Sequence, residues 1–99
     1  MSSSYEEVFT RSLTDPDGFW SEAAEEVSWI ETWDKVIDTS NPPFYRWFQG
    51  GVMNTCYNAV DLHVETGRAD QAALMYDSPV TGTVKTFTYR ELRDEISAF

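Results

Sequence analysis

The sequence predicts an α+β segment in which N-terminal helices are followed by a β-hairpin and a further helix. Two observations predict this class. Apolar residues recur at helical spacing near the start of the chain and again from Thr88 onward. Between these regions, residues 71–76 (QAALMY) and 83–88 (TVKTFT) are typical of two strands, joined by the turn-rich stretch DSPVTG. With 15% aromatic residues, the chain has the composition of a folded protein.

The first helix is expected over residues 4–13, with Ser3 or Ser4 available as its N-cap. One apolar stripe runs along it, formed by Tyr5, Val8, Phe9 and Leu13. The motif DPDGFW then begins a second helix, because Asp15 can cap it and Pro16 suits the first helical position. We expect the buried side of that second helix to consist of Trp20, Ala23, Ala24 and Val27.

The stretch from residue 28 to 54 is less regular. Residues 28–38 fit either a helix or an irregular aromatic-rich segment, and both alternatives stay open. TSNPPF breaks any helix at residues 39–44, since proline lacks a backbone donor. FYRWFQGGVMN predicts a short extended stretch, a turn at Gly50-Gly51 and a return to Asn54. Asn54 can cap a helix over about residues 55–66, which Gly67 can close.

The last element is a well-marked helix. Thr88 and Glu91 have the spacing of a reciprocal capping box. Leu92, Ile96 and Phe99 then lie on one apolar stripe. The helix reaches Phe99 without a terminating residue, and a hairpin is marginal without neighbouring strands. We therefore expect that residues 1–99 form a single N-terminal segment of a longer chain.

Charge limits the classes of partner. Net charge is −10, of which residues 1–38 carry −8 and residues 39–99 carry −2. Such an acidic chain is repelled by phosphate backbones and anionic lipids, which argues against binding to nucleic acid or membrane. The acidic run is explained by solvated helix faces, and the functional alternative is docking to a basic partner or mimicry of DNA. A single cysteine, no apolar leader after Met1 and no long apolar run favour a cytoplasmic protein.

The side chains that could take part in catalysis or metal binding do not form a catalytic pattern. Cys56 and His63 share a helix face beside Asp61 and Glu65, but zinc needs more converging ligands and direct Cys–His contact is ruled out by their spacing. Gly50-Gly51 lacks the sequence context of a phosphate-binding loop. Four tryptophans are best explained as packing anchors: Trp20, Trp29, Trp33 and Trp47. The sequence predicts no catalytic, cofactor-binding or metal-binding residue.

Several motifs nonetheless occur in a familiar order: DPDGFW, WFQGGVMNTCYNAVDLHV, GRADQAALMYDSPVTGT and TFTYRELRDEI. In this order they resemble the front of the short-chain AMP-forming acyl-CoA synthetases, the acetyl- and propionyl-CoA synthetases of the adenylate-forming superfamily. The resemblance covers roughly residues 5–99. The stretch from Trp47 to Thr83 is its most specific part, and is more similar to the propionyl branch.

This resemblance implies a parent enzyme that uses ATP, Mg and CoA. In that enzyme a short carboxylate attacks the α-phosphate of ATP, and the CoA thiol then displaces AMP to give the thioester. It also implies that the segment is an incomplete part of a large α/β adenylate-forming N-terminal domain. Residues 1–70 would be a mainly helical and irregular family-specific region, and residues 71–99 would begin the large domain. The family's catalytic motifs lie downstream, so the segment is expected to be inactive on its own.

Two hypotheses of function follow. In the first, the chain is the structural N-terminal part of such a ligase, with the remainder of the synthetase as its partner. In the second, it is an autonomous acidic protein-interaction module without catalysis. Self-association through the hairpin edges and the Leu92, Ile96 and Phe99 stripe is compatible with both.

Overall fold

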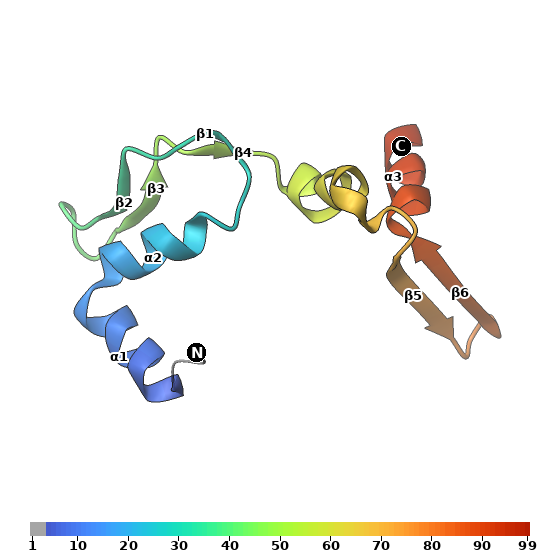
Figure 1. Cartoon of the computed structure of the whole chain (residues 1–99), viewed down its shortest axis with the longest axis horizontal. Coiled ribbons are helices and arrows are strands. Elements are labelled where there is room, and N and C mark those ends of the chain that lie inside the picture. Colours follow the sequence, from blue (N-terminus) through green and yellow to red (C-terminus); the bar gives the residue numbers. More distant parts are fainter. Residues whose placement is uncertain (1–3) are drawn as a thin grey trace. The chain divides into compact units, whose positions relative to one another are not determined.

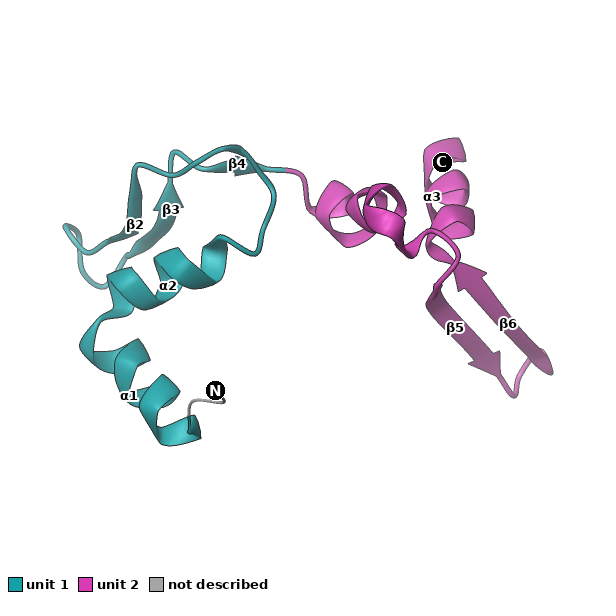
Figure 2. Ribbon diagram, in the orientation of Figure 1, with its two compact units in different colours: residues 1–53 teal, residues 54–99 magenta. Residues whose placement is uncertain are grey.

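The computed structural model describes residues 4–99, which divide into two units (Figure 2). The first unit ends at Met53 and the second runs from Asn54 to Phe99. Both units combine helices with short antiparallel strand pairs, so the predicted α+β class is confirmed.

The first unit begins with helix α1, Tyr5–Thr14, drawn in blue in Figure 1. Its N-cap is Ser4, whose hydroxyl accepts a hydrogen bond from the Glu7 amide (3.3 Å). The Glu7 carboxylate in turn accepts one from the Ser4 amide (2.9 Å). The predicted helix and its cap are confirmed, and the alternative cap, Ser3, lies outside the described residues.

Helix α2, Pro16–Ala24, follows after Asp15, whose carboxylate accepts a hydrogen bond from the Gly18 amide (3.1 Å). The start of α2 is therefore as predicted. The prediction of its buried side is largely wrong. Ala24 is buried, but Trp20 is 41% exposed and Ala23 is exposed, and Val27 lies beyond the end of the helix. The helix packs against the short strand β2, Lys35–Asp38, which is too small to cover its whole apolar side.

Four short strands occupy the rest of the first unit. They are β1 (Trp29–Glu31), β2, β3 (Arg46–Gln49) and β4 (Val52–Met53). β1 pairs antiparallel with β4, and β2 pairs antiparallel with β3, with Ile37 opposite Trp47. Residues 28–38 are thus extended rather than helical, as their β-branched and aromatic residues favour. The expected extended stretch and glycine turn are present, but β3 and β4 each pair with an earlier strand and not with one another.

The second unit opens with a helical stretch from residue 55 to 68. The Asn54 side chain accepts a hydrogen bond from the Tyr57 amide (2.9 Å), and Gly67 adopts a left-handed φ of 96° near the end, so both predicted boundary residues are confirmed. Two parts of the stretch are π-helical, η1 (Tyr57–Asp61) and η2 (Val64–Arg68), which the apolar spacing did not indicate.

A hairpin and a helix complete this unit. The strands β5 (Ala72–Ser78) and β6 (Thr83–Thr88) pair antiparallel, with Tyr76 opposite Lys85. β5 continues two residues beyond its predicted end. Helix α3 covers Tyr89–Ala98, and the capping box of Thr88 and Glu91 is formed as predicted.

Little of either unit is buried. Within residues 4–99, the buried hydrophobic residues are Ala24, Val36, Val60 and Ala69. The accessible surface is 7840 Å², whereas two compact bodies of these sizes would expose about 7,000 Å² together. The apolar stripes of α1 and α3 account for part of the excess, since Leu13 is 66% exposed and Ile96 is 41% exposed.

Candidate functional site

The first unit is held together by an aromatic cluster of Trp29, Trp33 and Phe48. Their three ring centroids lie 5.1–5.5 Å apart. The Trp29 indole N–H also donates a hydrogen bond to the Ala24 carbonyl (2.8 Å), which ties the cluster to the end of α2. Trp29 and Trp33 are therefore the packing anchors that the sequence predicted.

The other two tryptophans form a more open feature. Trp20, Trp47 and Phe48 line a hollow of about 200 Å³, which we call the aromatic hollow. The Trp20 and Trp47 rings meet edge to face, with centroids 6.0 Å apart and an angle of 80°. Trp20 is 41% and Trp47 49% exposed, so these two side chains are only partly packing anchors. Only aromatic side chains line the hollow, and the faces of aromatic rings attract cations and apolar groups.

The Gly50-Gly51 turn serves packing. A Cβ on Gly50 would lie 2.5 Å from an Asp34 carboxylate oxygen, and one on Gly51 would lie 2.7 Å from the Trp29 ring. Gly50 also has a left-handed φ of 82°. Because a carboxylate lies against the turn, it does not suit the phosphates of ATP or CoA, and we assign no nucleotide-binding role to it.

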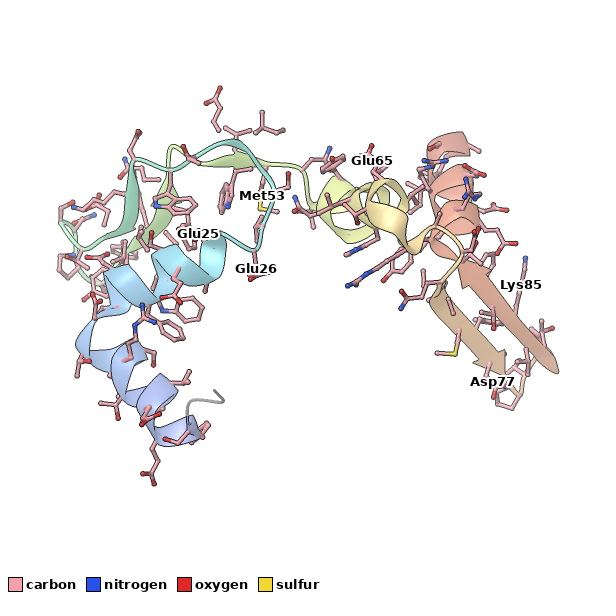
Figure 3. All side chains as sticks on the ribbon, viewed as in Figure 1. Glu25, Glu26, Met53, Glu65, Asp77 and Lys85 are labelled. Carbon is pink, nitrogen blue, oxygen red and sulfur yellow. The ribbon has the colours of Figure 1, made fainter. Side chains whose placement is uncertain are left out.

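The acidic side chains of the first unit have several roles. Asp15 and Glu7 cap helices, as described above. Arg11 forms an ion pair and hydrogen bond with Glu22, which lowers the pKa of the Glu22 carboxyl. Glu25 and Glu26 follow the end of α2 (Figure 3). Most of these carboxylates are exposed, as expected for solvated helix faces.

Cys56 and His63 are not brought together as a site. Cys56 is an exposed free thiol, whereas the His63 ring packs on Tyr89 with centroids 4.9 Å apart. Among residues 4–99, no three His, Cys, Asp or Glu side chains are grouped to hold a metal ion. Within the same range, every helix is too short or too polar to span a bilayer.

A contact that the sequence analysis missed lies on the same helical stretch. The Tyr57 hydroxyl donates a hydrogen bond to the Glu65 carboxylate (2.7 Å). Glu65 is labelled in Figure 3. This bond, with smaller contributions from burial and from the charges of Glu65 and Asp61, raises the pKa of the Tyr57 hydroxyl. The two residues are eight positions apart, a spacing that does not mark neighbours on an α-helix.

The geometry of the described residues does not identify the family of the protein, but comparison with known proteins does. The sequence family described as "Acetyl-coenzyme A synthetase N-terminus" matches residues 5–59. The chain belongs to this family. It is 48% identical over 95 residues to the human acyl-CoA synthetase short-chain family member 3, mitochondrial, a match that covers 96% of this chain and 14% of the human protein.

Bacterial relatives agree with this assignment. Acetyl-coenzyme A synthetase from Deinococcus radiodurans is 41% identical over 92 residues, and that from Streptomyces coelicolor is 38% identical over 91 residues. These matches cover 93% and 92% of this chain, and 14% of each relative. The chain therefore spans about one seventh of the length of the relatives it matches, and corresponds to an N-terminal segment of a short-chain acyl-CoA synthetase.

Proposed function

We propose that residues 1–99 are the structural N-terminal part of an AMP-forming acyl-CoA synthetase that acts on propionate or acetate. The overall reaction converts ATP, the carboxylate and CoA into acyl-CoA, AMP and pyrophosphate. The observation that carries this proposal is the match to synthetases over more than nine tenths of this chain.

The structural part of the proposal rests on the uncovered apolar faces. Phe9 and Leu13 of α1 are half or more exposed, and so is Phe99, which directly follows α3. Such stripes stabilise a fold only when another surface covers them. We propose that the remainder of the synthetase provides that surface and carries the chemistry, with ATP, Mg and CoA bound there. The single cysteine suits a reducing compartment such as the cytoplasm.

Pyrophosphate release tests the proposal. The full-length protein should release at most one pyrophosphate per enzyme from ATP and a short carboxylate, and should turn over, with release of AMP, only when CoA is also present. Comparing kcat/KM for propionate and acetate then gives the substrate preference. Residues 1–99 should release none, and turnover by this segment would overturn our placement of the chemistry. Carboxylate-dependent release of ADP by the full-length protein would overturn the AMP-forming mechanism.

A further inference from the structure

We propose that the aromatic hollow of Trp20, Trp47 and Phe48 binds a lysine or arginine side chain carried by a basic polypeptide segment of a partner protein. This interaction goes beyond the proposed function, and neither depends on the other. Three features of the first unit support it: the geometry of the rings, the absence of a cation over them within the unit, and the charge of the unit.

The ring geometry suits a cationic head group. The ring planes of Trp20 and Trp47 are inclined at 80° to one another, and those of Trp47 and Phe48 at 42°. The three rings are therefore not parallel, and their faces point in different directions. A cation within about 6 Å of a ring centroid is attracted by the negative face of the ring, most strongly by that of tryptophan. A hollow of about 200 Å³ admits the end of a lysine or arginine side chain, whose methylene stem also packs on aromatic surface.

The cations of the first unit lie elsewhere. Arg11 lies over the Phe19 ring, with its guanidinium carbon 6.0 Å from the centroid, and pairs with Glu22. Lys35 pairs with Asp38 at 3.5 Å. Arg46 precedes Trp47 in the chain but does not line the hollow. Within residues 4–99, no cation lies over the Trp20 or Trp47 ring.

The charge of the unit favours a basic partner. Residues 1–53 contain ten acidic and three basic side chains, a net charge of −7. Asp17 lies three residues before Trp20 on α2, a spacing that places both on neighbouring parts of one helix face. Such a field raises the local concentration of cationic segments and speeds their encounter with the site.

The composition of the hollow distinguishes it from the apolar stripes of α1 and α3. Those stripes contain valine, leucine or isoleucine and suit packing against a protein core. The hollow is lined only by aromatic side chains, two of them tryptophan, which are the residues that dominate binding hot spots. We therefore assign the hollow to a charged side chain and not to an apolar one.

Peptide binding to the full-length protein tests this proposal. The probe is a fluorescein-labelled peptide of alternating lysine and serine, followed by fluorescence anisotropy, with the uncharged norleucine-serine peptide as its counterpart. The lysine peptide should bind at least about tenfold more tightly than the norleucine peptide. Trp47→Leu should weaken the binding about tenfold, whereas Trp47→Phe, which keeps a ring face, should retain most of it.

Phe44→Ala is the matched control, because Phe44 is a 74% exposed aromatic residue of the same unit that does not line the hollow. It should leave the affinity unchanged. Equal affinity for the norleucine peptide would indicate apolar docking and overturn the proposal. So would unchanged binding by Trp47→Leu, which would indicate attraction to the acidic surface in general, or no binding of the lysine peptide at millimolar concentration.

Discussion

Replacing Gly51 by alanine tests how the aromatic cluster fixes the strands of the first unit. Gly51 is not among the residues with a left-handed φ, so alanine is not forced into the left-handed region there. Its Cβ would instead lie 2.7 Å from Trp29 Cζ3 and 3.0 Å from the Phe48 carbonyl oxygen. Carbon atoms pack at about 3.5–4.0 Å, so the Trp29 ring must retreat by nearly 1 Å.

Trp29 has little freedom to retreat. Its indole N–H is bonded to the Ala24 carbonyl at 2.8 Å, and its ring packs on Trp33 and Phe48. Weakening that hydrogen bond costs about 1 kcal/mol, and overpacking of this kind typically costs 1–3 kcal/mol. We therefore expect Gly51→Ala to lower the free energy of local opening by about 2 kcal/mol.

Amide hydrogen exchange measures this change. The Asp34 amide donates to the Gln49 carbonyl at 2.9 Å, next to the cluster, and its exchange should accelerate about 30-fold. Gly82→Ala is the control, since Gly82 has a φ of 64° but nothing within 4 Å of an added Cβ, and it should leave the Asp34 amide unaffected. In a Trp29→Ala background, most of the effect of Gly51→Ala should disappear. Exchange within twofold of the unaltered protein would refute the role assigned to this contact.

Two further predictions concern single side chains. Thr88→Ala removes the hydroxyl that accepts from the Glu91 amide at 3.2 Å, and should destabilise α3 by about 1 kcal/mol, seen as faster amide exchange in its first turn; unchanged exchange would contradict the capping role. Hydrogen bonds from Ser40, with a smaller contribution from Lys35, lower the pKa of Asp38. Because that pKa is lower in the folded state, the stabilisation exists above the ordinary carboxyl pKa and is lost as pH falls through the folded value. The protection factors of the β2 amides, in which the intrinsic pH dependence of exchange is divided out, should therefore fall on acidification, and Asp38→Asn should reduce this fall; an equal fall in the variant would show that another group is responsible.

Helix starts could be predicted from the sequence because they are set by neighbours in the chain. Each capping side chain bonds an amide three residues ahead, and the four cases are Ser4, Asp15, Asn54 and Thr88. The β5–β6 hairpin is equally local, since its strands follow one another across a short turn. These elements were predicted correctly.

Features that depend on distant residues were not predicted. β1 pairs with β4, and β2 with β3, so each pairing joins residues on the two sides of the TSNPPF segment. The residues of that segment do not indicate which residues of the two strands lie opposite one another. The exposure of Trp20 depends on how much of α2 the small strand β2 can cover. The packing of Gly51 against Trp29 likewise becomes visible only once both strand pairs are formed. The aromatic hollow went unnoticed for the same reason, because its side chains come from α2 and β3.

We propose that residues 1–99 are a structural part of a longer synthetase whose remaining residues cover the apolar stripes of α1 and α3. Hydrogen exchange detected by mass spectrometry tests it most directly, on peptides from residues 5–14 and 89–98, in the 99-residue chain and in the full-length protein. We predict that both regions exchange at least about tenfold more slowly in the full-length protein, because covered helices open less often. Equal exchange in the two proteins would mean that the stripes stay exposed, and would contradict the structural role proposed for residues 1–99.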